Sequence, residues 1–333
     1  MMACASALVR IAFVAALAIL AGVGVASAQQ PGAGANPPEP PPSIQPSQIQ
    51  PSRIQPQPIQ PPPGVTPVQF ASFDGVTTLT AYLARPEGDQ KRPAVVMLHG
   101  CSGLINPRGR FFQLYPAWLR TLTEQGYVVL VVDSATPRGF GQTCSAGEKR
   151  RTMLRDRPKD AYAALAWLQA QPFVRADRVA LIGWSQGGGI VLLSINDRSI
   201  GRPADLKTDF AAAVAFYPGS CSEKLQSAPY TRVPPHGWTA QVPLLVLFGE
   251  ADVWTELAPC RDFLEAAKAR GNAIELISYP NAVHAFDAPK LPRTELPQYR
   301  APDGRIPVVA TDQAARADAL SRVAAFLGRR LAE

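Results

Sequence analysis

A serine between two glycines stands where its hydroxyl could act as a nucleophile. Ser185 lies in the run Gly183-Trp184-Ser185-Gln186-Gly187, after the strand-length apolar run 179–182 and before 187–194, the predicted start of a buried helix. Glycine on both sides permits a sharp turn, which pushes the hydroxyl out over the edge of a sheet. The N-terminus of the helix favours developing negative charge. In this strand–turn–helix context the pattern predicts a catalytic serine rather than a structural turn.

The chain has three histidines, and a serine hydroxyl is a poor nucleophile without a base. His284 is the predicted base, because it follows the last predicted strand, 274–278, where the base of such a serine is found. His236 lies in a proline-rich loop and is expected to be a loop or pocket-wall residue. His99 follows an early predicted strand, 94–98, and is expected to shape the neighbouring turn.

The base in turn needs an acid, which holds its tautomer and stabilises the imidazolium. Asp252 is predicted for this role, because it follows strand 243–248 and completes the chain order Ser, Asp, His. Glu250 in the same loop is the competing candidate. Asp133 also ends a predicted strand, but it precedes the serine and is expected to be structural.

Two backbone N–H groups are predicted to hold the negative charge of a tetrahedral intermediate. One belongs to Gln186, directly after the serine. The second comes from the loop after strand 94–98, where the spacing favours the N–H of Cys101. The side chain of Cys101 would then be incidental to the chemistry.

From about residue 68 onward, the sequence alternates strands with helices that can position these groups. Residues 68–73 and 79–83 are predicted to form an opening hairpin around Asp74-Gly75. The later predicted strands are 94–98, 127–132, 179–182, 210–216, 243–248 and 274–278, and the predicted helices include 111–123, a segment around Asp160, 187–194 and a last helix capped by Thr311. This alternation predicts an α/β fold whose mostly parallel sheet is covered by helices on both faces. Ligands of such sheets bind at the carboxyl ends of the strands, where the candidate residues lie.

The N-terminal part of the chain has a different composition. Residues 1–28 are predicted to be a signal peptide, with Arg10 before the apolar run 11–25 and cleavage before Gln29, although an uncleaved anchor is the alternative. Residues 29–67 are rich in proline and repeat Ile-Gln-Pro at a five-residue period, which predicts a disordered, extended linker. The other interpretation of this segment is a spacer or a contact with the cell envelope. Residues 68–333 are the predicted catalytic domain.

Charge and cysteine content restrict the partners and the compartment. The formal net charge is +7, and no basic stripe with interleaved aromatic residues is visible, so nucleic acid is not an expected partner. Export to the periplasm or the medium would place the chain in an oxidising compartment. The exported part would keep four cysteines, Cys101, Cys144, Cys221 and Cys260, which allow two disulfides in three connectivities.

Together these motifs resemble the α/β-hydrolase superfamily and, more narrowly, an exported branch of the dienelactone hydrolase family. The segments that carry the resemblance are VVMLHGCSGL, VVDSATPRGFG, LIGWSQGGG, LLVLFGEADVWT and YPNAVHAF, and they cover essentially residues 68–331. The resemblance implies the α/β-hydrolase fold and a monomeric or dimeric ester or lactone hydrolase that needs no metal or other cofactor.

Two departures from the family pattern favour a generic serine carboxylesterase over a true dienelactone hydrolase. Ser185 stands where the namesake enzymes carry a cysteine nucleophile, and His99-Gly100 stands where they carry a glutamate. The usual strand order of the fold also implies the disulfide pairs Cys101–Cys144 and Cys221–Cys260, with free buried thiols as the alternative.

The predicted reaction is two-step acyl transfer on a small ester or lactone, with Ser185, His284 and Asp252 as the triad. Arg138 is a candidate for binding a substrate carboxylate, and Trp184 a candidate for an apolar wall beside the nucleophile. Residues 229–238 are expected to form a cap over the pocket. The alternatives are a peptidase or amidase on the same triad, and a non-catalytic protein that binds the envelope through its proline-rich segment.

Overall fold

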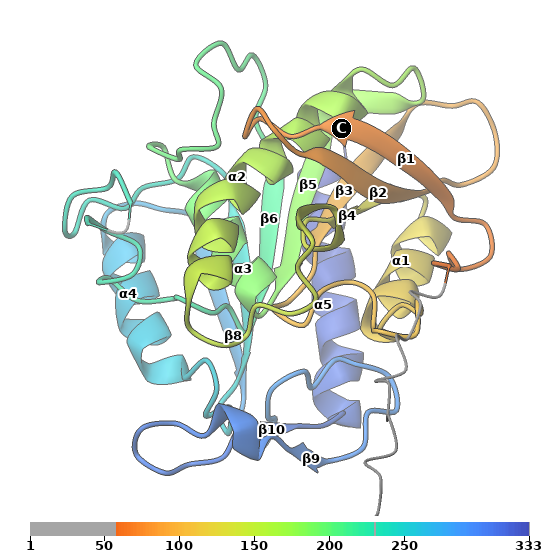
Figure 1. Ribbon diagram of the computed structural model, residues 1–333. Coiled ribbons are helices and arrows are strands. Elements are labelled where there is room, and N and C mark those ends of the chain that lie inside the picture. The colour runs from red at the N-terminus through yellow and green to blue at the C-terminus, as the bar shows by residue number, and fades with distance from the viewer. Residues whose placement is uncertain (1–57, 230, 333) are drawn as a thin grey trace, which may run out of the picture. The chain divides into compact units, whose positions relative to one another are not determined.

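The computed structural model describes residues 58–229 and 231–332 (Figure 1). The predicted signal peptide, 1–28, and residues 29–57 of the predicted linker lie outside the described residues. None of the described helices combines the length and the apolar character that a membrane crossing requires.

One sheet of eight strands organises the domain, in the order β1-β2-β4-β3-β5-β6-β7-β8. The first two strands form an antiparallel hairpin, and β2 is also antiparallel to β4, whereas β3 to β8 pair with one another in parallel. The strands are β1 (Thr66–Ala71), β2 (Thr78–Ala84), β3 (Arg92–Leu98), β4 (Val128–Asp133), β5 (Val174–Trp184), β6 (Ala212–Phe216), β7 (Leu244–Gly249) and β8 (Ile274–Tyr279). The expected mostly parallel sheet is confirmed, in the arrangement of the α/β-hydrolase fold.

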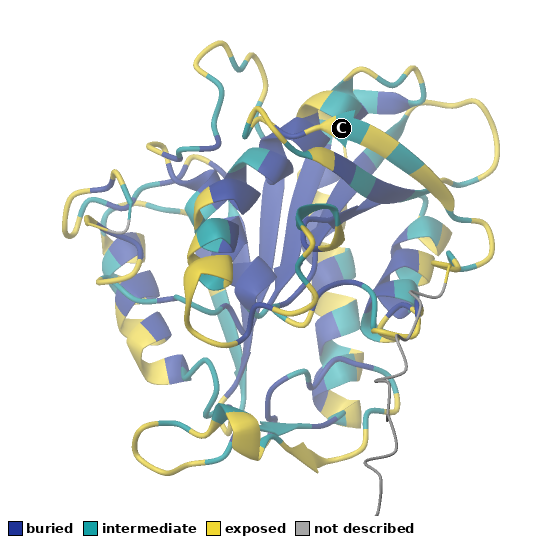
Figure 2. Ribbon diagram, in the orientation of Figure 1, coloured by how far each residue is buried: buried dark blue, intermediate teal, exposed yellow. Residues whose placement is uncertain are grey.

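The central strands are mostly apolar, as expected where helices cover both faces of the sheet. All six residues of β4 and all five of β6 are buried. In Figure 1, α2 (Glu148–Gln169) and α3 (Gln186–Ile195) lie in front of the sheet and α5 (Gln313–Leu331) lies behind it, while α1 (Leu114–Glu124) packs beside β4. Figure 2 shows the resulting burial: the central strands are dark, and the helices are exposed on their outer faces.

The last helix, α5, begins one residue later than predicted, because its N-cap is Asp312 and not Thr311. The side chain of Asp312, not Thr311, caps α5 by accepting a hydrogen bond from the N–H of Ala315. Thr311 instead accepts from the N–H of Leu291 and donates to the carbonyl of Ala288, so it ties down the segment that follows His284. Helix α4 (Leu257–Ala269) and the short pair β9 (Thr294–Glu295) and β10 (Val308–Val309) had no counterpart among the predicted elements.

Candidate active site

Ser185 occupies a strained turn between β5 and α3. Its φ of 54° and ψ of −117° are rare for a residue with a side chain, and backbone hydrogen bonds hold this conformation: its N–H donates to Phe216 and its carbonyl accepts from Gly219. A Cβ on Gly183 would lie 2.2 Å from the carbonyl oxygen of Gly187, and a Cβ on Gly187 would lie 2.3 Å from that of Leu98. Both glycines are therefore required by the close approach of strand and helix.

His284 and Asp252 form a buried hydrogen-bonded pair at the ends of β8 and β7. The distance between His284 Nδ1 and Asp252 Oδ2 is 2.6 Å. Asp252 also accepts bonds from the backbone N–H groups of Trp254 and Thr255 and from the Thr255 hydroxyl. Burial acts to raise the pKa of Asp252, but the charge of His284 and these hydrogen bonds outweigh it, so the pKa is lowered. An ionised Asp252 can hold a proton on Nδ1 and leave Nε2 of His284 as the basic atom.

The other candidate acids and bases are engaged in local structure. His99 is fully buried, with Nδ1 2.7 Å from the carbonyl oxygen of Gly100 and Nε2 accepting from the N–H of Ser134. His236 is exposed and lies beside Glu223. Glu250 accepts a hydrogen bond from the Ser278 hydroxyl, and Asp133 accepts from the N–H groups of the two residues at 135 and 136. Of the three histidines, His284 alone lines the cavity that Ser185 also lines.

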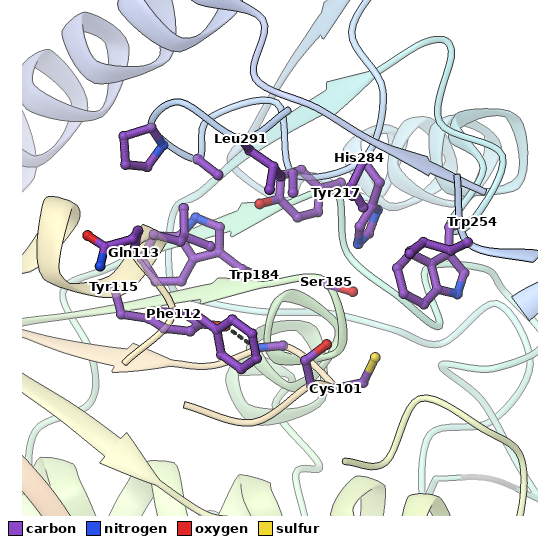
Figure 3. A pocket seen from close by; sticks show the side chains of 18 of the residues that line it. Cys101, Phe112, Gln113, Tyr115, Trp184, Ser185, Tyr217, Trp254, His284 and Leu291 are labelled. Carbon is purple, nitrogen blue, oxygen red and sulfur yellow. Dashed lines mark hydrogen bonds between the residues drawn. The ribbon is translucent and has the colours of Figure 1, made fainter. Parts of the chain in front are cut away.

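Ser185 and His284 open into an apolar cavity of about 590 Å³, seen from close by in Figure 3. Aromatic side chains form much of its wall, from Phe112, Tyr115, Trp184, Tyr217, Trp254 and Tyr299. Its far side is formed by the segment after His284, between residues 285 and 309, rather than by residues 229–238. The expected cap was therefore wrong: described residues of 229–238 do not line this cavity, and Thr231 and Arg232 line a separate hollow with residues of α2.

The two predicted oxyanion donors lie beside Ser185, and Cys101 also lines this cavity. Gln186 is the first residue of α3, and Cys101 lies in the loop after β3. No described residue accepts a backbone hydrogen bond from either N–H. Cys101 and Ser185 line the same cavity, so an ester carbonyl at Ser185 would lie within the region that these groups can serve.

Residues 79–331 match the sequence pattern of the dienelactone hydrolase family. The chain belongs to this family. A probable 2-oxo-3-(5-oxofuran-2-ylidene)propanoate lactonase of Bradyrhizobium sp is 28% identical over 212 residues, which cover 62% of this chain and 78% of the relative. The acylamino-acid-releasing enzyme of Homo sapiens is 27% identical over 245 residues, which cover 66% of this chain but only 32% of that enzyme.

The same fold is found in an esterase of solved structure. Thermogutta terrifontis esterase 2, phosphoramylated by tabun, superposes with a TM-score of 0.56 and 20% identity over 81% of this chain and 97% of the esterase. Membership of the dienelactone hydrolase family makes the protein a carboxylic ester hydrolase with a small-molecule ester substrate.

A second, more polar hollow of about 270 Å³ lies on another side of Ser185. It shares Cys101, Ser185 and Trp254 with the apolar cavity, and its remaining wall includes Arg150 and Glu256. Ser185 thus stands where an apolar and a polar compartment meet.

Two disulfides hold the loops around this polar hollow. Cys101 is bonded to Cys144 and Cys221 to Cys260, and the Cα atoms are 4.7 Å apart in each pair. These are the pairings that the family resemblance implied. The first bond joins the loop after β3 to the loop before α2, and the second joins the loop after β6 to α4.

Arg138 does not have the role of substrate ligand that the sequence suggested. Its guanidinium is buried and binds Asp160 through both terminal nitrogens, and one of these nitrogens also binds Asp74, at distances of 2.7 to 2.8 Å. One terminal nitrogen of Arg138 also donates to the carbonyl of Ser134. Because these partners occupy its donors and because Arg138 lines neither compartment at Ser185, the residue is structural.

Trp184 does line the apolar cavity, and it reveals a residue that sequence reasoning missed. Its ring is buried and its Nε1 donates to Asp287 Oδ2 at 2.8 Å. The same carboxylate accepts bonds from Trp118 Nε1 and the Tyr217 hydroxyl, at 2.7 and 2.6 Å. Burial raises the pKa of Asp287, although these three donors act to lower it. The only sequence signal for Asp287 is its position three residues after His284.

Proposed function

We propose that the protein is a serine carboxylesterase that cleaves esters or lactones through an acyl-enzyme on Ser185. The observation that carries this proposal is that a serine with positive φ and His284 line one cavity, and that His284 is hydrogen-bonded to the buried Asp252. Membership of the dienelactone hydrolase family supports the ester as the substrate class.

In the proposed mechanism Ser185 attacks the ester carbonyl while Nε2 of His284 takes the hydroxyl proton. Asp252 orients His284 and stabilises the imidazolium. The N–H groups of Cys101 and Gln186 bind the oxyanion, and the tetrahedral intermediate collapses as His284 protonates the departing alcohol. Water, deprotonated by His284, then attacks the acyl-enzyme, and the acid and free Ser185 are released.

The two compartments at Ser185 favour a substrate with one large apolar group. A cavity of about 590 Å³ lies within the range of small-molecule sites, and its aromatic wall suits an aryl or medium-length alkyl group. The smaller polar hollow would receive the other side of the ester. We expect KM to fall as the apolar group is lengthened until the cavity is full.

The test is hydrolysis of a chain-length series of aryl esters by the protein without residues 1–28 and by its Ser185→Ala variant. Turnover by the wild type and its loss in the variant would support the proposal. Equal turnover by both proteins would show that Ser185 is not the nucleophile. The chain-length optimum would measure the cavity.

A peptidase or amidase using the same three residues is the second candidate, favoured by the similarity to the acylamino-acid-releasing enzyme. Esters and amides with identical acyl groups separate the two activities. A kcat/KM for the amide equal to or above that for the ester would favour the peptidase.

Export is proposed for the same protein, and two disulfides support it. Fractionation of cells that produce the full chain would test export. A variant without residues 29–57 tests the remaining alternative, a non-catalytic envelope-binding protein. An esterase keeps its turnover after this deletion, whereas a binding protein loses attachment to the envelope and had no turnover to lose.

A further inference from the structure

Arg157 is a buried cation that the proposed triad does not use. It lies on α2 with no exposed surface, and no carboxylate among the described residues lies within salt-bridge distance of it. Burial lowers its pKa to about 10, so the guanidinium stays charged at neutral pH. A buried charge without a paired partner is costly to a fold. The Nε of Arg157 has no hydrogen-bond partner among the residues that the structure describes.

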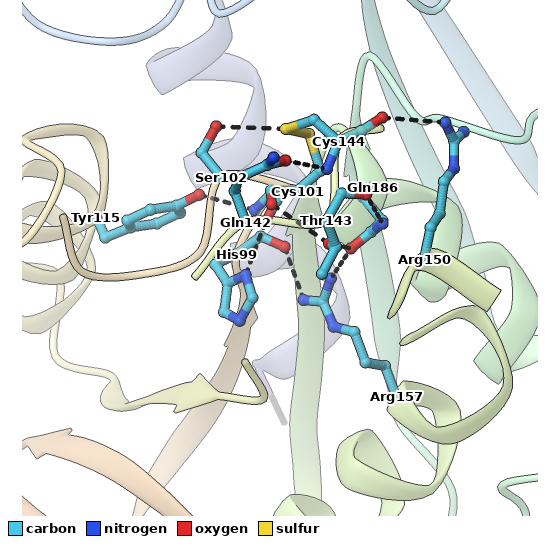
Figure 4. Close-up of a disulfide and its surroundings, with 11 residues drawn as sticks. His99, Cys101, Ser102, Tyr115, Gln142, Thr143, Cys144, Arg150, Arg157 and Gln186 are labelled. Atoms are coloured by element: carbon cyan, nitrogen blue, oxygen red, sulfur yellow. Dashed lines mark hydrogen bonds between the residues drawn. A yellow bond between two sulfur atoms is a disulfide. The ribbon is translucent and has the colours of Figure 1, made fainter. Parts of the chain in front are cut away.

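The two terminal nitrogens of Arg157 reach both segments that carry the proposed oxyanion donors. One nitrogen donates to the side-chain oxygen of Gln186 at 3.1 Å, and Gln186 directly follows the nucleophile. The other donates to the backbone oxygen of His99 at 2.7 Å, two residues before Cys101. Figure 4 shows this guanidinium between the two segments.

The orientation of the Cys101 N–H depends on the contacts of the preceding residues, His99 and Gly100. This N–H belongs to the peptide whose carbonyl is that of Gly100, and the two groups of a trans peptide point in opposite directions. The Gly100 oxygen lies 2.7 Å from His99 Nδ1 and also accepts from the N–H of Gly103. The His99 ring therefore holds the Gly100 carbonyl on its own side and directs the Cys101 N–H away from the ring. Arg157 in turn holds the backbone carbonyl of His99.

Thr143 and a disulfide close this network on its outer side. The Thr143 hydroxyl donates to the Gln186 side-chain oxygen, and the Thr143 N–H donates to the carbonyl of Cys101 at 2.8 Å. The next residue, Cys144, is bonded covalently to Cys101 (Figure 4). Arg157 thus links the two donor segments directly, and Thr143 links them a second time.

We propose that Arg157 is a positioning residue of the oxyanion hole, which holds the segments of Gln186 and Cys101 so that both N–H groups face the ester carbonyl. The inference rests on the proposed function, because it presupposes acyl transfer on Ser185. Arg157 acts in the transition state through these N–H groups, so its loss lowers kcat far more than it raises KM.

The test compares Arg157→Met and Arg157→Lys with a matched buried arginine, Arg138→Met. Arg138 binds Asp74 and Asp160 and contacts neither donor segment. Folding is followed by thermal unfolding, and rates are divided by the concentration of active sites from a burst titration. The second readout is the Ki of an aryl trifluoromethyl ketone, which forms a tetrahedral oxyanion on the serine.

We expect Arg157→Met to lower kcat by about 10²- to 10³-fold, with KM within about threefold, and to raise the Ki of the ketone in proportion. Arg157→Lys, which keeps the charge but reaches fewer acceptors, should fall between wild type and Arg157→Met. Arg138→Met should lose thermal stability but keep kcat per active site.

Arg157→Met with wild-type kcat and Ki per active site would overturn the inference. A loss of kcat in Arg138→Met as large as that in Arg157→Met would also overturn it, because the effect would then be general loosening of the fold. Turnover that survives Ser185→Ala would instead overturn the proposed function, and the inference with it.

Discussion

Two fully buried ionisable side chains of opposite sign lie beside the candidate triad, Arg157 and Asp287. Arg157 donates to a backbone oxygen and a side-chain oxygen in the segments that carry the oxyanion donors. Asp287 accepts from the ring N–H groups of Trp118 and Trp184 and from the hydroxyl of Tyr217. The cation therefore orders acceptors on the side where the oxyanion would form, and the acid orders donors on the histidine side.

The difference assigns separate tasks to the two groups. By holding oxygen atoms, Arg157 leaves N–H groups free for the reaction. By holding the polar ends of three aromatic side chains, Asp287 leaves the apolar faces of Trp184 and Tyr217 for the cavity. The ring of Tyr217 also packs against His284, with centroids 4.6 Å apart. We expect loss of Arg157 to lower kcat and loss of Asp287 to change stability and substrate binding.

The largest effect is expected where a carboxylate touches the histidine itself. Asp252→Asn should lower kcat by about 10⁴-fold, because the amide favours the wrong tautomer of His284 and cannot stabilise the imidazolium. Steady-state kinetics on one aryl ester measures this change, and Asp287→Asn is the matched control, with a loss of kcat of no more than about tenfold. Equal losses in the two variants would remove the distinction between the two carboxylates.

The two disulfides should differ in their effect on kcat, as Arg157 and Asp287 are expected to do. Replacing Cys101 and Cys144 together by alanine should lower kcat by about 10- to 100-fold, because a small displacement of the Cys101 N–H is sufficient for such a loss. Replacing Cys221 and Cys260 should leave kcat within about threefold, while either pair loses about 2–4 kcal/mol of unfolding free energy. Kinetics and urea unfolding measure the two effects. An identical kinetic loss in both double variants would mean that the first bond has no particular role at the donors.

Asp287→Asn should lower the free energy of unfolding and raise KM. The amide offers one acceptor oxygen to three donors and brings its own N–H groups against them, so we expect a loss of about 1–3 kcal/mol. KM for a bulky aryl ester should rise more than KM for an acetate ester, since the ring of Trp184 loses its anchor. Urea unfolding and kinetics on the two esters check this. A variant with unchanged stability and unchanged KM ratio would contradict the wall-forming role.

The smallest effect is expected at Asp74, which is bonded to neither Arg157 nor Asp287. Burial acts to raise its pKa, but hydrogen bonds from Thr77, Val76 and Arg138 lower it well below the usual value. Its stabilisation is therefore present above the unfolded pKa of about 3.9 and is lost as the pH falls through the folded value. Between pH 5 and pH 3 the unfolding free energy of Asp74→Asn should fall less steeply than that of the wild type. Parallel slopes in urea unfolding at these pH values would contradict this.

The sequence predicted the elements whose signals are local. Four apolar residues on one face of α2, Ala161, Ala164, Leu165 and Leu168, are fully buried, and each strand predicted from residue 68 onward overlaps a strand of the sheet. The fold and the family were predicted from the order and spacing of short motifs. These motifs also placed Asp252 and His284 in loops that the structure brings together, while the catalytic roles of these residues stay predictions.

The features that sequence reasoning missed depend on contacts between distant segments. Arg138 carries a charge that suits a substrate carboxylate, but its partner Asp74 is 64 residues away in the chain. Asp287 shows its role only when Trp118, 169 residues earlier, folds against it. The cavity wall after His284 was likewise missed, because a loop's path over a sheet is not encoded in its own composition.

The most direct test of acyl transfer on Ser185 is covalent labelling of the protein without residues 1–28 by an alkyl fluorophosphonate, followed by peptide mass spectrometry and ester turnover. We expect one adduct per chain, located on Ser185, with turnover lost in proportion to labelling and no adduct on the folded Ser185→Ala variant. Labelling of another residue with loss of turnover, or full turnover by a chain labelled on Ser185, would contradict acyl transfer on Ser185.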